Sequence, residues 1–239
     1  TALAMFTAEK EGLNEMESAA TIAVPKVWQV GIFEERAYIM MEHIENKASN
    51  ANADYIKLER QLAHMHQHRQ SRFGFSANNF IGSLPQSNKQ HDNWVSFYWH
   101  ERIAPQLAMA HRKNLLHAKE LITEEKGIAT INDIVGNEVK PSLLHGDLWG
   151  GNYLIHANGT PFLIDPAVYY GHSMVDIAMS KLFGGFAASF YSAYHDVIPK
   201  PSNYQQQIEL YQLYFLLVHL NLFGASYYGR VKELLDRYF

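Results

Sequence analysis

Apolar and polar residues alternate along this chain with periods that predict helices in some segments and strands in others. Apolar residues at helical spacing predict an amphipathic first helix, although Gly12 weakens that prediction. The last predicted helix is apolar on nearly every side, which is typical of a helix buried in a core. A long helical region in the middle of the chain ends at Gly127, a residue type that commonly caps helices. The predicted helices cover residues 3–17, 55–68, 94–127 and 205–223.

The remaining segments predict strands and connections. Residues 24–31 and 36–42 read as two strands joined by a short turn. Residues 73–93 are rich in Gly, Pro, Asn and Ser, which predicts a loop, and the Asn- and Ala-rich residues 45–54 are typical of a linker. The pattern therefore predicts a small β-containing part followed by a larger helical part.

A short hairpin is predicted in the second half of the chain. Residues 153–155 and 162–164 are β-prone runs, and Asn158-Gly159 between them is the dipeptide that most readily supplies a tight hairpin turn. Asn152 precedes the outgoing strand and Asp165 follows the returning one. We therefore expect these two side chains to lie side by side at the open end of the hairpin.

The pair Asn152 and Asp165 suits a hard cation. Directly opposed residues of a strand pair have Cα atoms roughly 4.5–5.5 Å apart, so an amide oxygen and a carboxylate can converge on one ion. Magnesium is commonly held by one or two carboxylates together with substrate phosphates. The hairpin thus predicts Asn152 and Asp165 as Mg²⁺ ligands.

Asp147 lies in the tight segment HGDLWGGN, just before this hairpin. A carboxylate held beside a metal can orient a hydroxyl and accept its proton, which is the role of a base in phosphoryl transfer. An Asn follows five positions later and a second Asp eighteen positions later, which is the spacing of the catalytic and metal-binding residues of protein-kinase-like folds. Protein kinases have His-Arg-Asp and Asp-Phe-Gly where this chain has His-Gly-Asp and Asp-Pro-Ala, and these differences favour a small-molecule substrate.

The composition excludes several classes of protein. Of the 239 residues, 47% are hydrophobic and 18% are charged, which permits a sizeable core, and the net charge of −4 provides no basic surface for nucleic acid or anionic membrane. The absence of cysteine excludes disulfides, thiolate catalysis and cysteine-based zinc sites. The first residues do not resemble a signal peptide, and the apolar tract at 211–223 is too short and too often interrupted to span a membrane. We expect a cytoplasmic protein without nucleic-acid or membrane partners.

Several motifs together resemble the fructosamine kinase (ketosamine-3-kinase) family, whose relatives are the aminoglycoside phosphotransferases and choline kinases. The motifs are LLHGDLWGGN, IDPAVYYGH and DIAMSKLFGGF, and residues 73–88, 92–110 and 210–224 resemble further family segments in the same order. The resemblance covers nearly the whole chain. It implies transfer of phosphate from ATP, with Mg²⁺, to a sugar hydroxyl of a small-molecule or protein-bound ketoamine, the adduct formed when a sugar glycates an amine.

The resemblance also implies an α+β, protein-kinase-like fold of two lobes. Residues 1–44 would form part of the small lobe with its antiparallel sheet, residues 45–54 the linker, and residues 55–239 the mostly helical large lobe. The family's phosphate-covering, Gly-rich hairpin and its lysine would precede Thr1. We therefore expect the small lobe to be incomplete in this sequence and the protein in the cell to carry an upstream segment. The alternative is a natural truncation that cannot bind nucleotide in the ordinary way.

The resemblance assigns nucleotide contacts to the small lobe. Glu9 would pair with the upstream lysine that holds the α- and β-phosphates, and Lys10 and Lys26 are poor substitutes for that lysine. Glu42 and His43 would be the hinge whose backbone groups bind adenine. The alternative for Glu42 and His43 is an ordinary strand end followed by a loop.

Other residues near the motifs have two interpretations. The resemblance implies that His145 and Asp176 support the catalytic loop, and Asp176 also suits a helix N-terminus. Trp149 offers an aromatic face to the sugar or packs in the core. A metal site on the helix over residues 55–68 is rejected, because no carboxylate completes a ligand set with His64, His66 and His68.

Two further pairs of polar residues lie on predicted helices. His219 and Asn221 lie in an apolar helix and therefore need partners. They make core hydrogen bonds or line the sugar pocket. Arg102 and Gln106, one helical turn apart, form structural bridges or contact substrate, and we favour structural bridges.

Alternative functions follow from the same residues. Phosphorylation of an aminoglycoside or of choline is the neighbouring option. A kinase-like scaffold that transfers no phosphate is an option from a different class, although the intact set of Asp147, Asn152 and Asp165 argues against it. A glycosidase with Asp147 and Asp165 as its carboxylate pair is disfavoured, because Asn152 is aligned for metal.

Overall fold

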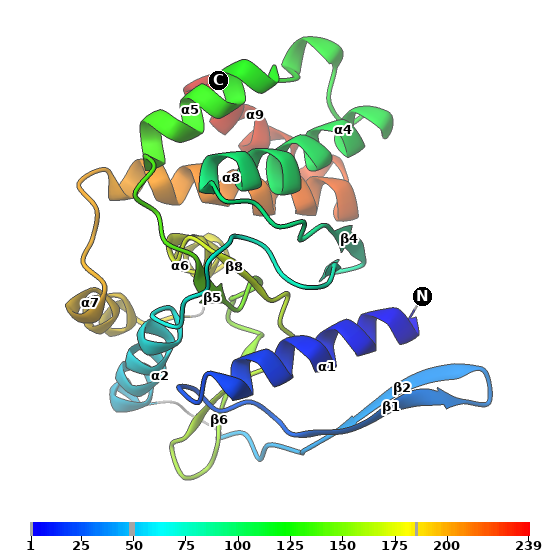
Figure 1. The fold of residues 1–239 in the computed structure, drawn as a ribbon, viewed down its shortest axis with the longest axis vertical. Coiled ribbons are helices and arrows are strands. Elements are labelled where there is room, and N and C mark those ends of the chain that lie inside the picture. Colours follow the sequence, from blue (N-terminus) through cyan, green and yellow to red (C-terminus); the bar gives the residue numbers. More distant parts are fainter. Residues whose placement is uncertain (1, 48–50, 185) are drawn as a thin grey trace.

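The computed structural model describes residues 2–47, 51–184 and 186–239. Its first helix, α1 (Ala2–Ser18), buries Leu13 and Met16 and matches the predicted helix closely. It packs along an antiparallel hairpin of β1 (Val27–Phe33) and β2 (Arg36–Met41), which projects from the molecule (Figure 1). The two predicted strands are therefore confirmed, with their ends displaced by up to three residues.

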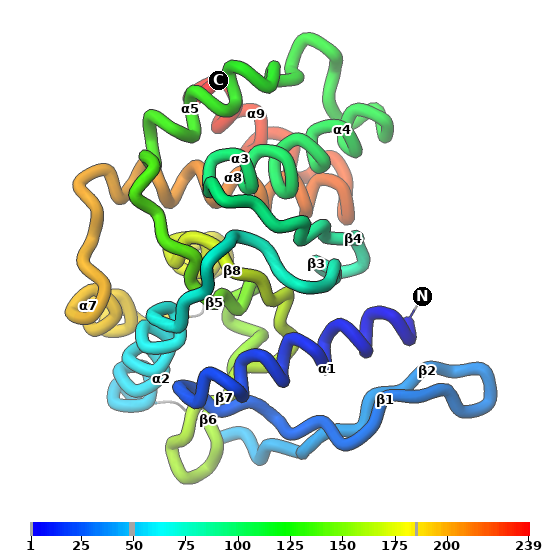
Figure 2. The backbone as a smooth tube through the Cα atoms, viewed as in Figure 1, coloured from blue at the N-terminus to red at the C-terminus, as the bar shows by residue number. Residues whose placement is uncertain are grey.

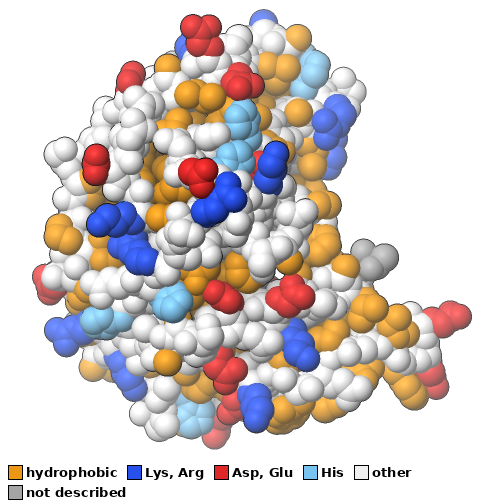
Figure 3. Space-filling view, viewed as in Figure 1, with side chains coloured by type: hydrophobic (Ala, Val, Ile, Leu, Met, Phe, Trp, Pro, Cys, Tyr) orange, Lys and Arg blue, Asp and Glu red, His pale blue; other side chains and the backbone are white. Residues whose placement is uncertain are grey.

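The projecting hairpin exposes large apolar side chains. Trp28, Ile32 and Phe33 are each more than half exposed. Figure 3 shows hydrophobic side chains along this hairpin at the right of the molecule. Other described residues therefore leave these apolar side chains of the β1–β2 pair largely uncovered.

The second helix, α2 (Asn52–Met65), begins three residues before its predicted start. The Asp54 carboxylate explains the early start, because it accepts a hydrogen bond from the Ala51 N–H at 2.7 Å and a salt bridge from Lys47 at 2.8 Å. The predicted linker over residues 45–54 includes residues 48–50, which lie outside the described residues. The predicted division of the chain into a small and a large lobe at this linker stays a prediction.

The segment predicted as a loop contains a hairpin of two very short strands, β3 (Asn79–Ile81) and β4 (Leu84–Gln86). The turn uses Gly82 at a φ of +54°. The strands are three residues long, and the buried side chains of Asn79 and Gln86 hold them through hydrogen bonds. Because polar side chains stabilise this hairpin, the hydrophobic pattern does not reveal it.

The single helix predicted over residues 94–127 is replaced in the structure by several shorter elements. They are α3 (Trp94–Tyr98), a π-helical turn (Trp99–Ile103), α4 (Ala104–Arg112), a 3₁₀ turn (Ala118–Glu120) and α5 (Glu124–Val135). The prediction that Gly127 caps a helix is wrong, because Gly127 lies inside α5. A Cβ atom there would lie 2.1 Å from Cζ3 of Trp99, so the glycine allows close packing.

The predicted hairpin at 153–164 is present as β6 (Tyr153–Ile155) and β7 (Pro161–Leu163). Beside it, β5 (Ser142–Leu144) pairs with β8 (Tyr169–Gly171). Every sheet among the described residues has two antiparallel strands. The remaining helical elements are α6 (Met174–Leu182), α7 (Ala188–Val197), α8 (Tyr204–Phe223), a 3₁₀ turn (Ala225–Tyr227) and α9 (Tyr228–Tyr238).

Helix α8 is the centre of the helical part, as its apolar sequence predicts. It is buried along most of its length and contacts α4, α5, α6 and α9 (Figure 2). Helices and small antiparallel sheets together confirm the predicted α+β class. No helix in the described part of the chain has the length and apolar character needed to cross a lipid bilayer.

Candidate active site

The β6–β7 hairpin brings Asn152 and Asp165 to the same end of the strand pair. The Ile164 N–H donates to the Asn152 carbonyl at 3.1 Å, so Ile164 lies opposite Asn152, and Asp165 lies one residue further along. Asp165 takes the left-handed backbone conformation, with a φ of +53°. In the turn, Gly159 has positive φ, whereas Asn158 does not. The two residues are thus neighbours, offset by one position from the direct opposition that we predicted.

The Asn152 side chain joins the loop of Asp147 to the end of the hairpin. Its amide nitrogen lies 2.9 Å from the Asp147 carbonyl oxygen, 3.3 Å from Asp147 Oδ2 and 3.5 Å from the Asp165 carbonyl oxygen. Among the described residues no donor is paired with the amide oxygen of Asn152. That oxygen is therefore available to a cation, while the nitrogen fixes the orientation of the amide.

Asp176, near the start of α6, holds the loop that carries Asp147. Its buried carboxylate accepts hydrogen bonds from the N–H groups of His145 at 2.7 Å and Gly146 at 2.9 Å, and contacts His66 Nε2 at 3.1 Å. Burial acts to raise the pKa of Asp176, but the hydrogen bond and charge of His66, together with His145 and Gly146, lower it overall. The supporting role of Asp176 was predicted, whereas the contact of His66 with Asp176 was not. The other ring nitrogen of His66 contacts the hydroxyl of Tyr194 at 2.7 Å.

His145 connects the same loop to the end of the hairpin. Its Nε2 donates to the Ile164 carbonyl at 2.9 Å, and its Nδ1 accepts from the Asp147 N–H at 3.2 Å. Burial lowers the pKa of His145, which favours the neutral ring that this pairing needs. Gly146 has a φ of +86°, and a Cβ there would lie 2.1 Å from the Ala167 carbonyl oxygen. The loop and the segment after Asp165 are therefore packed backbone against backbone.

Three carboxylates, those of Asp147, Asp165 and Glu9, border the smaller cavity and concentrate negative charge at the site. Burial, followed by the charges of Asp165 and Asp176, raises the pKa of Asp147 to about 7. Burial and the charge of Asp165 also raise the pKa of Glu9, on α1, to about 7. Asp165 itself is exposed. A divalent cation near Asp165 would offset this repulsion.

The donor set fits magnesium better than a metal that needs a full protein cage. Among the described residues no three acidic or histidine side chains form a closed metal site. One carboxylate and one amide oxygen, from Asp165 and Asn152, are nevertheless enough for an ion that takes its other ligands from phosphates and water.

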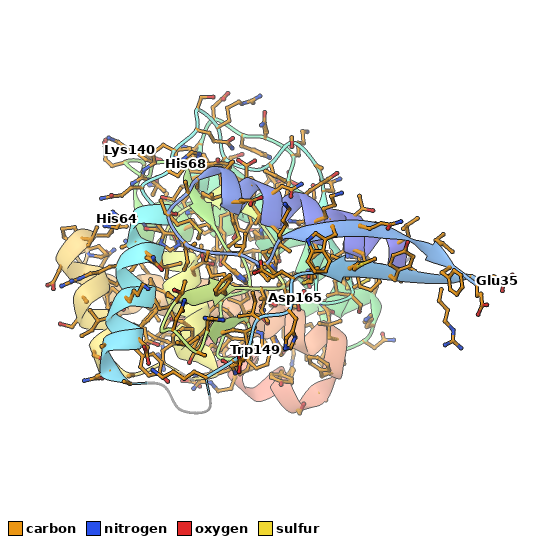
Figure 4. The ribbon with its side chains drawn as sticks, turned by 90° about the horizontal axis from the view of Figure 1, so that it is seen from below. Glu35, His64, His68, Lys140, Trp149 and Asp165 are labelled. Atoms are coloured by element: carbon orange, nitrogen blue, oxygen red, sulfur yellow. The ribbon has the colours of Figure 1, made fainter. Side chains whose placement is uncertain are left out.

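Two cavities meet at Asp147 and Asp165. The smaller, of about 190 Å³, also contains Glu9 and is bordered by the β3–β4 hairpin. The larger, of about 430 Å³, is mostly apolar. Its aromatic lining consists of Trp149, Phe183, His219, Phe223 and Tyr227. Figure 4 shows Trp149 and Asp165 in the middle of the molecule, far from Glu35 at the tip of the β1–β2 hairpin.

The structure distinguishes among the predicted substrate residues. Trp149 is 41% exposed and lines the larger cavity, so it is not a core tryptophan. His219 lines the same cavity, while its Nδ1 donates to the Phe215 carbonyl at 2.8 Å. Asn221 lines neither cavity, and its amide nitrogen donates to the carbonyl and side-chain oxygens of Gln106 at 3.0 and 2.8 Å. Asn221 thus makes the core hydrogen bonds that we gave as its alternative.

The predicted hinge residues are exposed and lie just after β2. The Glu42 N–H donates to the Lys26 carbonyl at 2.8 Å. No backbone hydrogen bond of His43 is found in the described part of the chain. Neither residue lines the two cavities at Asp147. Their role toward adenine stays a prediction.

Comparisons with known proteins agree on one family. The family model described as fructosamine kinase matches residues 1–239. A "Probable ketoamine kinase" of Enterococcus faecium is 37% identical over 237 residues, which cover 98% of this chain and 82% of the relative. The chloroplastic "Protein-ribulosamine 3-kinase" of Arabidopsis thaliana is 37% identical over 241 residues, which cover 98% of this chain and 72% of the relative.

Solved structures support the same conclusion. A crystal structure from Haemophilus somnus, described as "Putative fructosamine-3-kinase", matches with a TM-score of 0.88 and 26% identity, covering 98% of this chain and 79% of that one. An aminoglycoside phosphotransferase matches with a TM-score of 0.57 and 15% identity over 98% of this chain and 84% of its own, a likeness of fold alone. The predicted protein-kinase-like fold is confirmed.

Proposed function

This chain belongs to the fructosamine kinase family and is a phosphotransferase with an alcohol group as acceptor, and we propose that it phosphorylates a sugar hydroxyl of ketoamines at the expense of ATP. The observation that carries the proposal is the convergence of Asp147, Asn152 and Asp165 where the smaller cavity, which contains Glu9, meets the larger apolar cavity. The relative named for protein-bound ribulosamine supports deglycation of proteins or small amines as the purpose.

Asp147 is the base in this proposal. Its carboxylate would hydrogen-bond the sugar hydroxyl and accept the hydroxyl proton as the sugar oxygen bonds to the γ-phosphorus of ATP and the bond from that phosphorus to ADP breaks. A pKa near 7 suits a group that must be ionised before the reaction and protonated after it. The amide of Asn152 holds one oxygen of Asp147 at 3.3 Å, which leaves the other to face the hydroxyl.

Asn152 and Asp165 are the residues that would hold Mg²⁺. Glu9 would pair with the expected upstream lysine, and that lysine would contact the phosphates. Bound Mg·ATP would supply the transferred phosphoryl group, and its Mg²⁺ ion would supply positive charge beside the carboxylates of Asp147, Asp165 and Glu9. The unpaired amide oxygen of Asn152 and the exposed carboxylate of Asp165 support this assignment. Adenine recognition is assigned to the backbone of Glu42 and His43, and the absence of any backbone hydrogen bond of His43 among the described residues supports it.

The aromatic cavity receives the ketoamine. Trp149, from the catalytic loop, and His219, from α8, both border it. Burial lowers the pKa of His219, so its ring is neutral near pH 7 and adds no positive charge. An apolar cavity with carboxylates at one end suits a polar sugar, placed at Asp147, that carries a less polar amine substituent.

The first experiment measures Mg²⁺-dependent ATP turnover with fructose-lysine and ribulose-lysine. The 239-residue chain and the protein expressed from its complete reading frame are assayed in parallel. Asp147→Asn should lower kcat by roughly 10²–10⁴, the usual contribution of a positioned base, with little change in affinity for Mg·ADP. Asp133→Asn, on the exposed side of α5, is the matched control and should retain full turnover.

Two outcomes would contradict the proposal. Turnover of Asp147→Asn at the rate of the unchanged protein would remove Asp147 as the base. Failure of both unchanged proteins to phosphorylate any ketoamine, while a ligand still binds, would favour the kinase-like scaffold.

A further inference from the structure

The carbonyl groups that follow Asp165 are held by two buried amide side chains. Asn79 donates to the Val168 carbonyl at 2.8 Å, and Gln86 donates to the Ala167 carbonyl at 3.3 Å. Both amides belong to the β3–β4 hairpin, which has no part in the proposed chemistry. Asp165 has positive φ, a conformation that persists in a non-glycine residue only when its surroundings hold it. These hydrogen bonds are therefore among the restraints on the Asp165 turn.

The two amides are in turn oriented by residues further from the site. The side-chain oxygen of Asn79 accepts from Gln86 Nε2 at 2.8 Å and from Asn88 Nδ2 at 2.9 Å. The side-chain oxygen of Asn88 accepts from Arg102 Nη2 at 2.7 Å. Asn79, Asn88, Gln86 and Arg102 are all buried, and we call these four residues the buried polar chain.

Arg102 is the end of the buried polar chain that lies furthest from Asp165 along its hydrogen bonds. Its guanidinium is fully buried, and no carboxylate lies within ion-pair distance of it among the described residues. It donates to the carbonyls of Ser87 at 2.5 Å and Glu101 at 2.9 Å, and lies 4.0 Å from the centre of the Tyr169 ring. Burying an arginine without an acidic partner is costly. A cost of this kind indicates a role that a neutral side chain would not fill.

That role follows from the chemistry of the donors. A guanidinium only donates, so the oxygen of Asn88 must face Arg102 and its nitrogen must face Asn79. The oxygen of Asn79 must then face Asn88, which leaves the nitrogen of Asn79 for the Val168 carbonyl. Asn88 Nδ2 also donates to the Ala77 carbonyl at 3.0 Å. Arg102 on the oxygen of Asn88 and the Ala77 carbonyl on its nitrogen thus fix the direction of each hydrogen bond as far as the segment after Asp165.

We propose that Arg102 is a positioning residue for Asp165 and acts through Asn88 and Asn79. The proposal rests on the proposed function for the meaning of Asp165 as a metal ligand. Loss of hydrogen-bond direction at Asn88 releases the Val168 carbonyl, loosens the Asp165 turn and weakens binding of Mg·ADP. Asp165 also borders the ketoamine cavity, but the aromatic side of that cavity is formed by other elements, so ketoamine binding should change less than Mg·ADP binding.

Asn88→Asp is the sharpest test, because it preserves size and gives Arg102 an ion-pair partner. The new carboxylate cannot donate, so the side-chain oxygen of Asn79 keeps Gln86 and loses Asn88 as a donor, and the Ala77 carbonyl loses its donor as well. We expect hydrogen exchange of the amides in residues 165–170 to become faster and the affinity for Mg·ADP, measured by calorimetry, to fall roughly 10–100-fold, as for other residues that orient metal ligands. The KM for ketoamine should change less than the affinity for Mg·ADP, because the aromatic lining of the ketoamine cavity belongs to other elements than the buried polar chain.

The matched control is Gln207→Glu, a buried amide on α8 whose Nε2 donates to the Ile134 carbonyl at 3.3 Å, away from Asp165. It should lose stability without losing Mg·ADP affinity. Unchanged exchange and affinity in Asn88→Asp would overturn the proposal, and so would an equal loss of affinity in the control.

A second variant covers the case in which Asn88→Asp does not fold. Arg102→Lys keeps the charge but cannot reach Asn88 and the Ser87 carbonyl with one planar group, so it should lose part of the affinity. Mg·ADP affinity equal to that of the unchanged protein would then overturn the proposal. Exchange of residues 165–170 does not depend on catalysis, so absence of ketoamine turnover would contradict the proposed function and leave this test intact.

Discussion

At the scale of single residues, burial of ionisable side chains makes the stability of this protein depend on pH, and Glu59 on α2 shows this effect most directly. The side chain is fully buried and accepts a hydrogen bond from the Tyr194 N–H, but its second oxygen has no partner in the described part of the chain. Burial raises the pKa of Glu59 to about 8. The folded protein therefore keeps a proton on Glu59 that the unfolded chain, with an ordinary glutamate pKa near 4.3, has released at neutral pH.

Glu59→Gln should change how stability depends on pH. Between about pH 4.3 and pH 8 the folded state binds more protons at Glu59 than the unfolded state, so its free energy of unfolding falls as pH rises. Glutamine keeps the acceptor for Tyr194 and does not ionise. Urea unfolding at pH 6 and pH 8 should show that the unchanged protein loses about 2–3 kcal/mol more than the variant does, which corresponds to two pH units at 1.36 kcal/mol each. Parallel pH profiles would contradict the expected ionisation.

Single residues were predicted from sequence where they lie close together along the chain. Asp147, Asn152 and Asp165 occupy one segment with a characteristic spacing, and the structure brings them together. His66 and Asn79 were missed, because their partners Asp176 and Val168 are about 90 to 110 residues away. Asp176 lies close to the segment that it supports and could be recognised. No local sequence pattern predicts a hydrogen bond between residues as far apart along the chain as His66 and Asp176 or Asn79 and Val168.

At the scale of elements, hydrophobic periodicity predicted the long helices. It did not predict the elements that depend on buried polar side chains or on breaks in helical geometry. Helices α1 and α8 match their predicted ranges within about one residue at each end, because an apolar face or an apolar core segment defines them. The β3–β4 hairpin depends on buried amides instead. The region from α3 to α5 contains a π-helical turn and two breaks that the apolar pattern does not mark.

Gly127→Ala tests the packing of α5 on that π-helical turn. Alanine favours a helix by about 1 kcal/mol over glycine, but its Cβ would lie 2.1 Å from Trp99, so we expect a net loss of about 1–3 kcal/mol. Gly229→Ala is the matched control on α9, where a Cβ meets no atom within 4 Å. Chemical unfolding should show no loss for the control, or a gain of up to ~1 kcal/mol. Equal stability of both variants would mean that Trp99 moves aside without cost.

At the scale of the whole molecule, the site is an assembly of distant parts. Glu9 comes from α1, Gly82 from the turn of the β3–β4 hairpin, and His219 from α8, and each borders a cavity that contains Asp147 and Asp165. A ligand that fills the smaller cavity therefore contacts both the first helix and the central hairpin. Its binding should stabilise the complete fold rather than one element.

Asp165→Asn tests this link between binding and global stability. Asparagine tolerates positive φ, so the turn should survive while the metal-binding charge is lost. A ligand at 100 times its Kd stabilises the folded state by about 2.7 kcal/mol. Thermal unfolding should therefore show a clear rise in Tm with Mg·ADP for the unchanged protein and for Asp133→Asn, and little rise for Asp165→Asn. An undiminished rise in Asp165→Asn would place the metal elsewhere.

The contact between Gly146 and the Ala167 carbonyl constrains how this protein can evolve. Any side chain at position 146 would need both a strained backbone and a shift of the segment that carries Asp165. Protein kinases have arginine at the corresponding position of their catalytic motif. A lineage that keeps the Gly146 contact can therefore reach that motif only if the Asp-Pro-Ala segment changes at the same time. We therefore expect that a single substitution of Gly146 by arginine would displace the segment that carries Asp165 and lower activity.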